Sequence, residues 1–149
     1  MRTPKILLFA AIAAFAVPWT LTITQPRAAT VVYRVIVHPS NPATVVDRKF
    51  VADAFLKKIS RWNESEAIRP VDLEVDNLAR RKFSEDILRR SVSAVKSYWQ
   101  QMVFSGRDVP PPELDTDEDV IRFVLRYSGS IGYVSGNANL DRVKAVTVK

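Results

Sequence analysis

Two of the chain's four glycines, Gly129 and Gly132, stand three positions apart in the run from Ser128 to Val134. A glycine can end a helix in a left-handed turn, and it leaves room where a larger side chain would clash. The apolar residues that follow Gly129 favour a buried strand. The run therefore predicts a helix that stops and a core strand that begins immediately afterwards.

The first 29 residues have the pattern of an export signal. Two basic residues precede an apolar run over residues 6–17, and the small residues Ala28 and Ala29 follow. Arg27 stands where a small residue is expected for cleavage after Ala29, so retention as an inner-membrane anchor stays open as the alternative. We expect a signal peptide at 1–29 and one exported domain at 30–149.

Residues 30–149 suit one domain of ordinary size. They carry 19 basic and 16 acidic side chains, a surplus too small to argue for nucleic-acid binding. The chain has no cysteine, which excludes disulfides, thiol catalysis and thiolate metal sites. These features favour a periplasmic protein that is stabilised by packing alone.

The order of the expected elements indicates an α/β fold. Pro70 favours an edge position for its strand, and short crossovers predict that the early strands are parallel. Residues 92–103 have the most regular amphipathic spacing, so we expect that helix to pack on the sheet. We expect strands at 31–37, 68–73, 131–134 and 143–148, and helices that begin at Asp47, Asn77, Ser91 and Thr116.

Catalysis has little support in the sequence. The single histidine, His38, precedes Pro39 and is better explained as a loop residue than as a base. Acidic residues at 115–119 lack the spacing and the glycine of a calcium loop, and they fit the first turn of a helix. We therefore expect no enzyme activity, no metal and no cofactor.

The densest basic cluster lies at residues 80–90. A solvated helix face explains most of it, although Arg80 lies near a helix start, where free amides attract anions. Tyr98 and Trp99 follow Val95 at helical spacing, which favours a core position over a stacking platform for a ligand.

Several motifs occur in a fixed order: the turn at 39–42, the segment Phe55–Trp62, Tyr98–Trp99, Phe104–Gly106 and the run Gly129–Val134. Their order resembles the phosphate-type periplasmic substrate-binding proteins of ABC transporters over residues 35–134. Full members have two α/β lobes hinged around the ligand. The resemblance implies one such lobe, a mostly parallel central sheet flanked by helices.

Members of this family hold phosphate with a loop of the type Arg-Ser-Asp-Gly-Ser-Gly-Thr. When Phe83 is used as the anchor, the corresponding positions carry Leu73, Asn77, Leu78 and Ala79, and only Asn77 keeps polar binding capacity. The remaining groups at strand ends and at the helix start predict an anion site at Ser40, Asn41, Asn77, Arg80 and Ser130.

The resemblance implies noncovalent and weak binding of phosphate or another oxyanion, with an ABC transporter permease as partner. Loss of the usual donors supports an alternative, an envelope interaction or adaptor protein that has kept the lobe fold and lost its ligand site. A homodimer or an unlike partner would complete the cleft.

Overall fold

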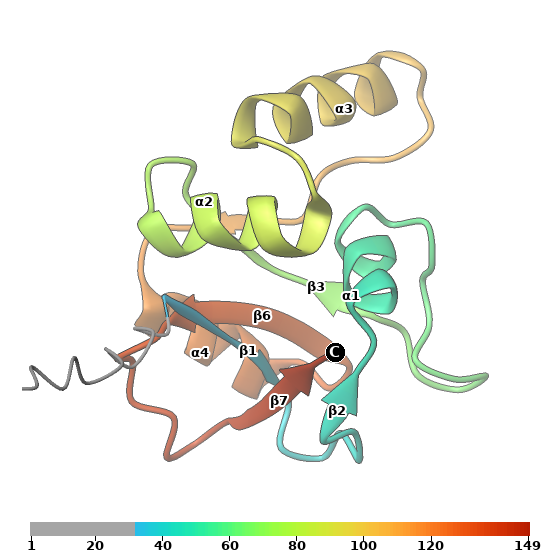
Figure 1. Ribbon diagram of the computed structural model, residues 1–149. Helices are drawn as coiled ribbons and strands as arrows, with labels where there is room; N and C mark the ends of the chain where they lie inside the picture. The colour runs from blue at the N-terminus through green and yellow to red at the C-terminus, as the bar shows by residue number, and fades with distance from the viewer. Residues whose placement is uncertain (1–31) are drawn as a thin grey trace, which may run out of the picture.

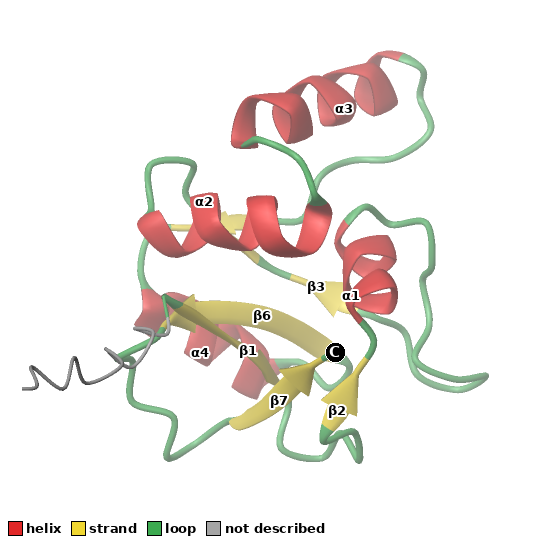
Figure 2. Ribbon diagram, viewed as in Figure 1, coloured by secondary structure: helices red, strands yellow, loops and turns green. Residues whose placement is uncertain are grey.

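A five-stranded mixed sheet forms the centre of this computed structural model, which describes residues 32–149 (Figures 1 and 2). The outer strands β2 and β3 run parallel to their neighbours β7 and β6, whereas the central strand β1 runs antiparallel to both β6 and β7. In spatial order the strands are β2 (Val45–Val46), β7 (Lys144–Val148), β1 (Tyr33–Val37), β6 (Ser130–Ser135) and β3 (Arg69–Pro70).

The α/β class is therefore confirmed, with a sheet that is mixed rather than mostly parallel. The early strands β1 and β3 were expected to be parallel, and this expectation was wrong. The late strand β6 lies between them, antiparallel to β1 and parallel to β3. Pro70 lies on the edge strand, as predicted, where its missing N–H disturbs no ladder.

Helices cover both faces of the sheet (Figures 1 and 2). One face carries α4, and the other carries α1 and α2, with α3 stacked outside α2. A separate pair of short parallel strands, β4 (Asp72–Leu73) and β5 (Glu113–Leu114), lies below α3. The helices are α1 (Arg48–Phe55), α2 (Leu78–Phe83) with its π-helical continuation η1 (Ser84–Leu88), α3 (Val92–Phe104) and α4 (Asp117–Arg126).

The prediction that the helix at 92–103 packs on the sheet was wrong. Only Val95 and Trp99 of α3 are buried, and α3 lies against η1 instead. The Tyr98 hydroxyl ties the helix to the end of α1 by donating to the Leu56 carbonyl oxygen over 2.9 Å. The four predicted helix starts are confirmed, because each cap side chain accepts an N–H from the following turn.

The glycine run forms the expected junction between α4 and β6. Gly129 has φ +75°, and a Cβ there would collide with the Ala67 carbonyl oxygen. A Cβ on Gly132 would lie 2.8 Å from side-chain carbons of Val120 and Val71, so this glycine lets α4 approach β6 closely. The Trp62 indole donates to the Gly129 carbonyl oxygen over 2.9 Å, which joins two of the motifs noted in the sequence.

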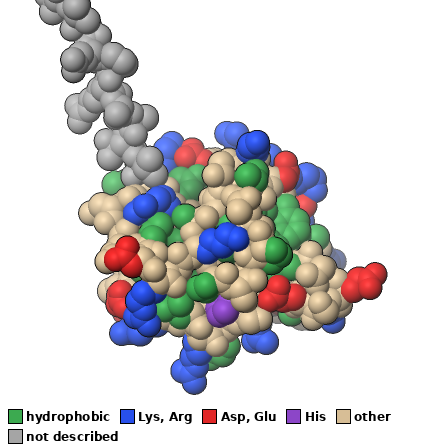
Figure 3. Space-filling model, turned by 90° about the horizontal axis from the view of Figure 1, so that it is seen from below, with side chains coloured by type: hydrophobic (Ala, Val, Ile, Leu, Met, Phe, Trp, Pro, Cys, Tyr) green, Lys and Arg blue, Asp and Glu red, His purple; other side chains and the backbone are tan. Residues whose placement is uncertain are grey.

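Aromatic side chains fill the core between the sheet and the layer of α1 and α2. The rings of Phe83 and Tyr133 stack with centroids 3.9 Å apart, and Phe55 and Tyr33 pack around them. On the face seen in Figure 3, basic and acidic side chains are interspersed. That face therefore presents no continuous basic surface.

The expected signal peptide at 1–29 lies outside the described residues. Within residues 32–149, none of the helices combines the length and apolar character required to cross a membrane.

Candidate ligand-binding site

Three of the predicted binding residues, Ser40, Asn41 and Ser130, lie together where β1 ends and β6 begins. The Ser40 hydroxyl lies 2.6 Å from Nδ1 of His38, and the Ser130 hydroxyl donates to the Tyr127 carbonyl oxygen over 2.6 Å. Asn41 is 2 % exposed, and its Oδ1 accepts the amide N–H two residues later. The oxygens of these side chains therefore already serve the turns that carry them, whereas the buried Nδ2 of Asn41 has no hydrogen-bond partner within residues 32–149. Ligand binding by these residues stays a prediction.

The other two predicted residues, Asn77 and Arg80, lie at the start of α2. Arg80 Nη1 is 3.4 Å from the hydroxyl of Tyr133. Tyr133 follows Ser130 by three residues along β6, a distance of about 10 Å, and side chains three apart in a strand point to opposite faces. The five predicted residues therefore lie in two separate groups, and one small anion cannot contact both groups.

The start of α2 presents backbone amides rather than side-chain donors. The Asn77 side chain accepts from the Ala79 N–H over 2.8 Å, so its oxygen is used as the helix cap. Leu78, the first residue of the helix, is 62 % exposed. An anion at this position would depend on the remaining first-turn amides.

Arg80 is buried in an ion-pair cluster. Its Nη1 pairs with the buried Asp72, and its Nη2 lies 3.6 Å from Glu113 Oε1. The Tyr133 hydroxyl also donates to Asp72. Two carboxylates thus face one guanidinium, which weakens the attraction of this place for a further anion. This cluster could not be predicted from the sequence, because Asp72 and Glu113 belong to strands that pair only in the folded chain.

Two tyrosines of the same core stay protonated at neutral pH. Burial raises the pKa of Tyr133 above its ordinary value, with Arg80 opposing the shift. Burial, together with the charge of Asp86, raises the pKa of Tyr33 to about 12. The Tyr133 phenol is therefore a fixed donor to Asp72 rather than a titrating group.

A groove of about 500 Å³ lies beside Arg80, between α3 and the segments that flank β4 and β5. Its polar residues include Lys96 and Glu113. We call it the α3 groove; its apolar lining consists of Val75, Val92, Trp99, Val103, Phe104 and Pro110.

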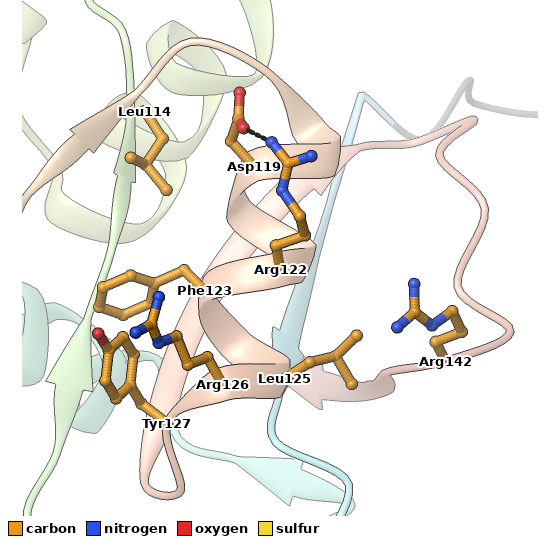
Figure 4. A pocket seen from close by; sticks show the side chains of 8 residues that line it. All are labelled: Leu114, Asp119, Arg122, Phe123, Leu125, Arg126, Tyr127 and Arg142. Carbon is orange, nitrogen blue, oxygen red and sulfur yellow. Dashed lines mark hydrogen bonds and ion pairs between the residues drawn. The ribbon is translucent and has the colours of Figure 1, made fainter.

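A second hollow, of about 510 Å³, lies along α4 (Figure 4). Arg122 there pairs with Asp119, and the Arg126 guanidinium lies 5.5 Å from the centre of the Tyr127 ring. This hollow could not be predicted from the sequence, because Arg142 reaches it from the loop before β7. Within residues 32–149, the histidine and acidic side chains form no group of three that could hold a metal ion.

No protein-family model and no curated protein matches the sequence. Solved structures do match the fold. A phosphate ABC transporter substrate-binding protein from Clostridium perfringens, with bound phosphate, has 23 % identity and a TM-score of 0.60 over 80 % of this chain and 47 % of its own. An ABC-type phosphate transport receptor from Vibrio cholerae has 17 % identity and a TM-score of 0.58 over 80 % of this chain and 48 % of its own.

The protein PstS from Borrelia burgdorferi is similar in the same way, with 11 % identity and a TM-score of 0.59 over 79 % of this chain and 47 % of its own. The chain thus spans about half the length of the structures that it matches. At these identities the likeness shows the fold. The resemblance read from the sequence is confirmed at that level: the chain has the fold of phosphate-type substrate-binding proteins over about half their length.

Proposed function

We propose that this chain is an exported, non-catalytic binding protein that binds phosphate or another oxyanion weakly in the periplasm. The observation that carries the proposal is the fold shared with substrate-binding proteins, one of which contains bound phosphate. An ABC transporter permease is the partner that this function implies.

The start of α2 is the place that we assign to the anion. The first-turn amides of a helix have no acceptor within the helix, and the helix dipole favours negative charge there. Binding is weak because the nearby Arg80 already faces Asp72 and Glu113.

The test is thermal unfolding in a panel of oxyanions, with chloride at matched ionic strength as the reference. A ligand at ten times its Kd stabilises the folded state by about 1.4 kcal/mol, which raises Tm by several degrees. The control variant is Asn77→Asp, which keeps a helix cap but adds a negative charge at the proposed site.

We expect phosphate to raise Tm of the unmodified chain and to have a smaller effect on Asn77→Asp. The absence of a shift with every oxyanion would contradict the proposal. An equal rise of Tm in both proteins would show that the anion binds elsewhere than at the start of α2.

A second candidate function is that of an envelope adaptor protein. The neutralised Arg80 and the exposed Leu78 favour it, because both stand where an anion site needs free donors. An adaptor forms a stable complex in envelope extracts whether or not phosphate is added. Recovery of the chain only as a free monomer after gentle crosslinking would contradict this candidate.

A further inference from the structure

Exposed apolar side chains gather at the α3 groove. Of the six large apolar side chains that are exposed within residues 32–149, five line the groove or stand within three residues of a lining residue, and the sixth is Val45. Phe104, at the end of α3, is 91 % exposed. Exposed apolar side chains that gather at one place mark a contact surface, whereas apolar residues scattered singly over a surface do not.

The α3 groove and Phe104 are complementary to each other. The groove has apolar walls and a volume in the range that accepts a small organic ligand, so a phenyl ring fits in it. Phe104 stands at its rim with almost its whole side chain in solvent. In a two-fold contact, each copy can therefore place Phe104 in the groove of the other.

The charges at the groove are also self-complementary. Lys96 makes no ion pair within the described residues, and the side chain of Glu113 is 44 % exposed. A two-fold contact that brings Lys96 of one copy to Glu113 of the other repeats the same pair on the opposite side of the axis. The same two residues, Lys96 and Glu113, therefore supply both ion pairs of the proposed contact.

The exposed Phe104 and the two opposite charges at the groove, Lys96 and Glu113, all fit a copy of the same chain. We propose that a second copy of this chain covers the α3 groove through a two-fold contact, with Phe104 of each copy seated in the groove of the other. This inference goes beyond the proposed oxyanion binding and does not rest on it.

The first test is the mass of the protein in solution. The full sequence is expressed, purified from envelope extracts in density-matched mild detergent, and measured by sedimentation equilibrium without phosphate. We expect twice the mass of one copy. Phe104→Asp should raise the dissociation constant at least tenfold, whereas Val45→Asp, at an exposed apolar residue outside the groove, should leave it unchanged. Circular dichroism checks that both variants are folded.

A mixing experiment tests the charged pair. Lys96→Glu and Glu113→Lys each place like charges across the proposed contact, so each variant alone should be largely monomeric. A mixture of the two restores opposite charges at both positions and should form a dimer of one copy of each. A monomeric parent protein, an equal loss in Phe104→Asp and Val45→Asp, or a mixture that stays monomeric would overturn the proposal. None of these results changes the outcome of the oxyanion panel, so the two proposals fail separately.

Discussion

The helices α4 and α3 lie on opposite sides of the molecule and use their apolar residues differently (Figure 1). On α4, Val120, Ile121 and Val124 are buried against β6, at a distance that Gly132 permits. On the longer α3, burial is limited to two residues, and the terminal Val103 and Phe104 remain exposed. The helix α4 therefore completes the core, whereas the α3 side has apolar surface left for binding.

The largest expected effect concerns the ion pair below α3. Arg80→Met leaves the buried Asp72 without its cation, and we expect a loss of about 3–5 kcal/mol in the free energy of unfolding. The matched control is Arg81→Met at the exposed neighbour, which should change stability by less than about 0.5 kcal/mol. Denaturant unfolding measures both variants. A stable Arg80→Met protein that no longer responds to phosphate would show instead that Arg80 serves the ligand.

The next effect compares the two helices directly. Ile121→Ala on α4 opens a cavity against the sheet, so we expect a loss of about 2–5 kcal/mol. Phe104→Ala on α3 should change the unfolding free energy by no more than about 0.5 kcal/mol, because the ring is in solvent in the single copy. Denaturant titrations at protein concentrations below the dimer's dissociation constant measure both. Comparable losses of unfolding free energy in Ile121→Ala and Phe104→Ala would contradict the proposed difference between the two helices.

The smallest expected effect is a loss of stability at alkaline pH, caused by Tyr33, which packs against Phe83 of α2. The pKa of Tyr33 is raised to about 12 in the folded state, mainly by burial, whereas the unfolded chain releases this proton near its ordinary value of 10. The stabilisation is therefore complete below pH 10 and is lost as the pH rises toward 12. We expect Tm to fall over this interval, and to fall less in Tyr33→Phe. Parallel curves for the two proteins would refute this assignment.

Local features of the fold were predictable from the sequence. The caps at Asp47 and Thr116, the edge position of Pro70 and the turn at Gly129 depend on neighbouring residues, and the structure confirms them. Strand direction was not predictable, because β6 enters between β1 and β3 from the far end of the chain. The position of α3 outside α2 was not predictable, because the spacing of apolar residues in a helix is the same whether they face a sheet, another helix or a partner protein.

The candidate site was predictable only in part. The sequence correctly placed Asn77 at a helix start, but it could not show that Asn77 and Ser130 serve separate places. The ion-pair partners of Arg80 depend on the pairing of β4 with β5. This pairing brings Glu113 close to the Arg80 guanidinium, although the two residues are 33 positions apart in the chain. Whether a charged residue binds a ligand or a neighbour is decided by such long-range contacts.

Bismaleimide crosslinking of single-cysteine variants tests the contrast between the two helices most directly, because the chain has no cysteine of its own. Gln100→Cys places a thiol in the α3 groove, and Arg122→Cys places one in the hollow along α4. We expect a covalent dimer from Gln100→Cys and a monomer from Arg122→Cys under the same conditions. Equal crosslinking at both positions, or crosslinking at Arg122→Cys alone, would contradict the claim that the α3 side is the binding face.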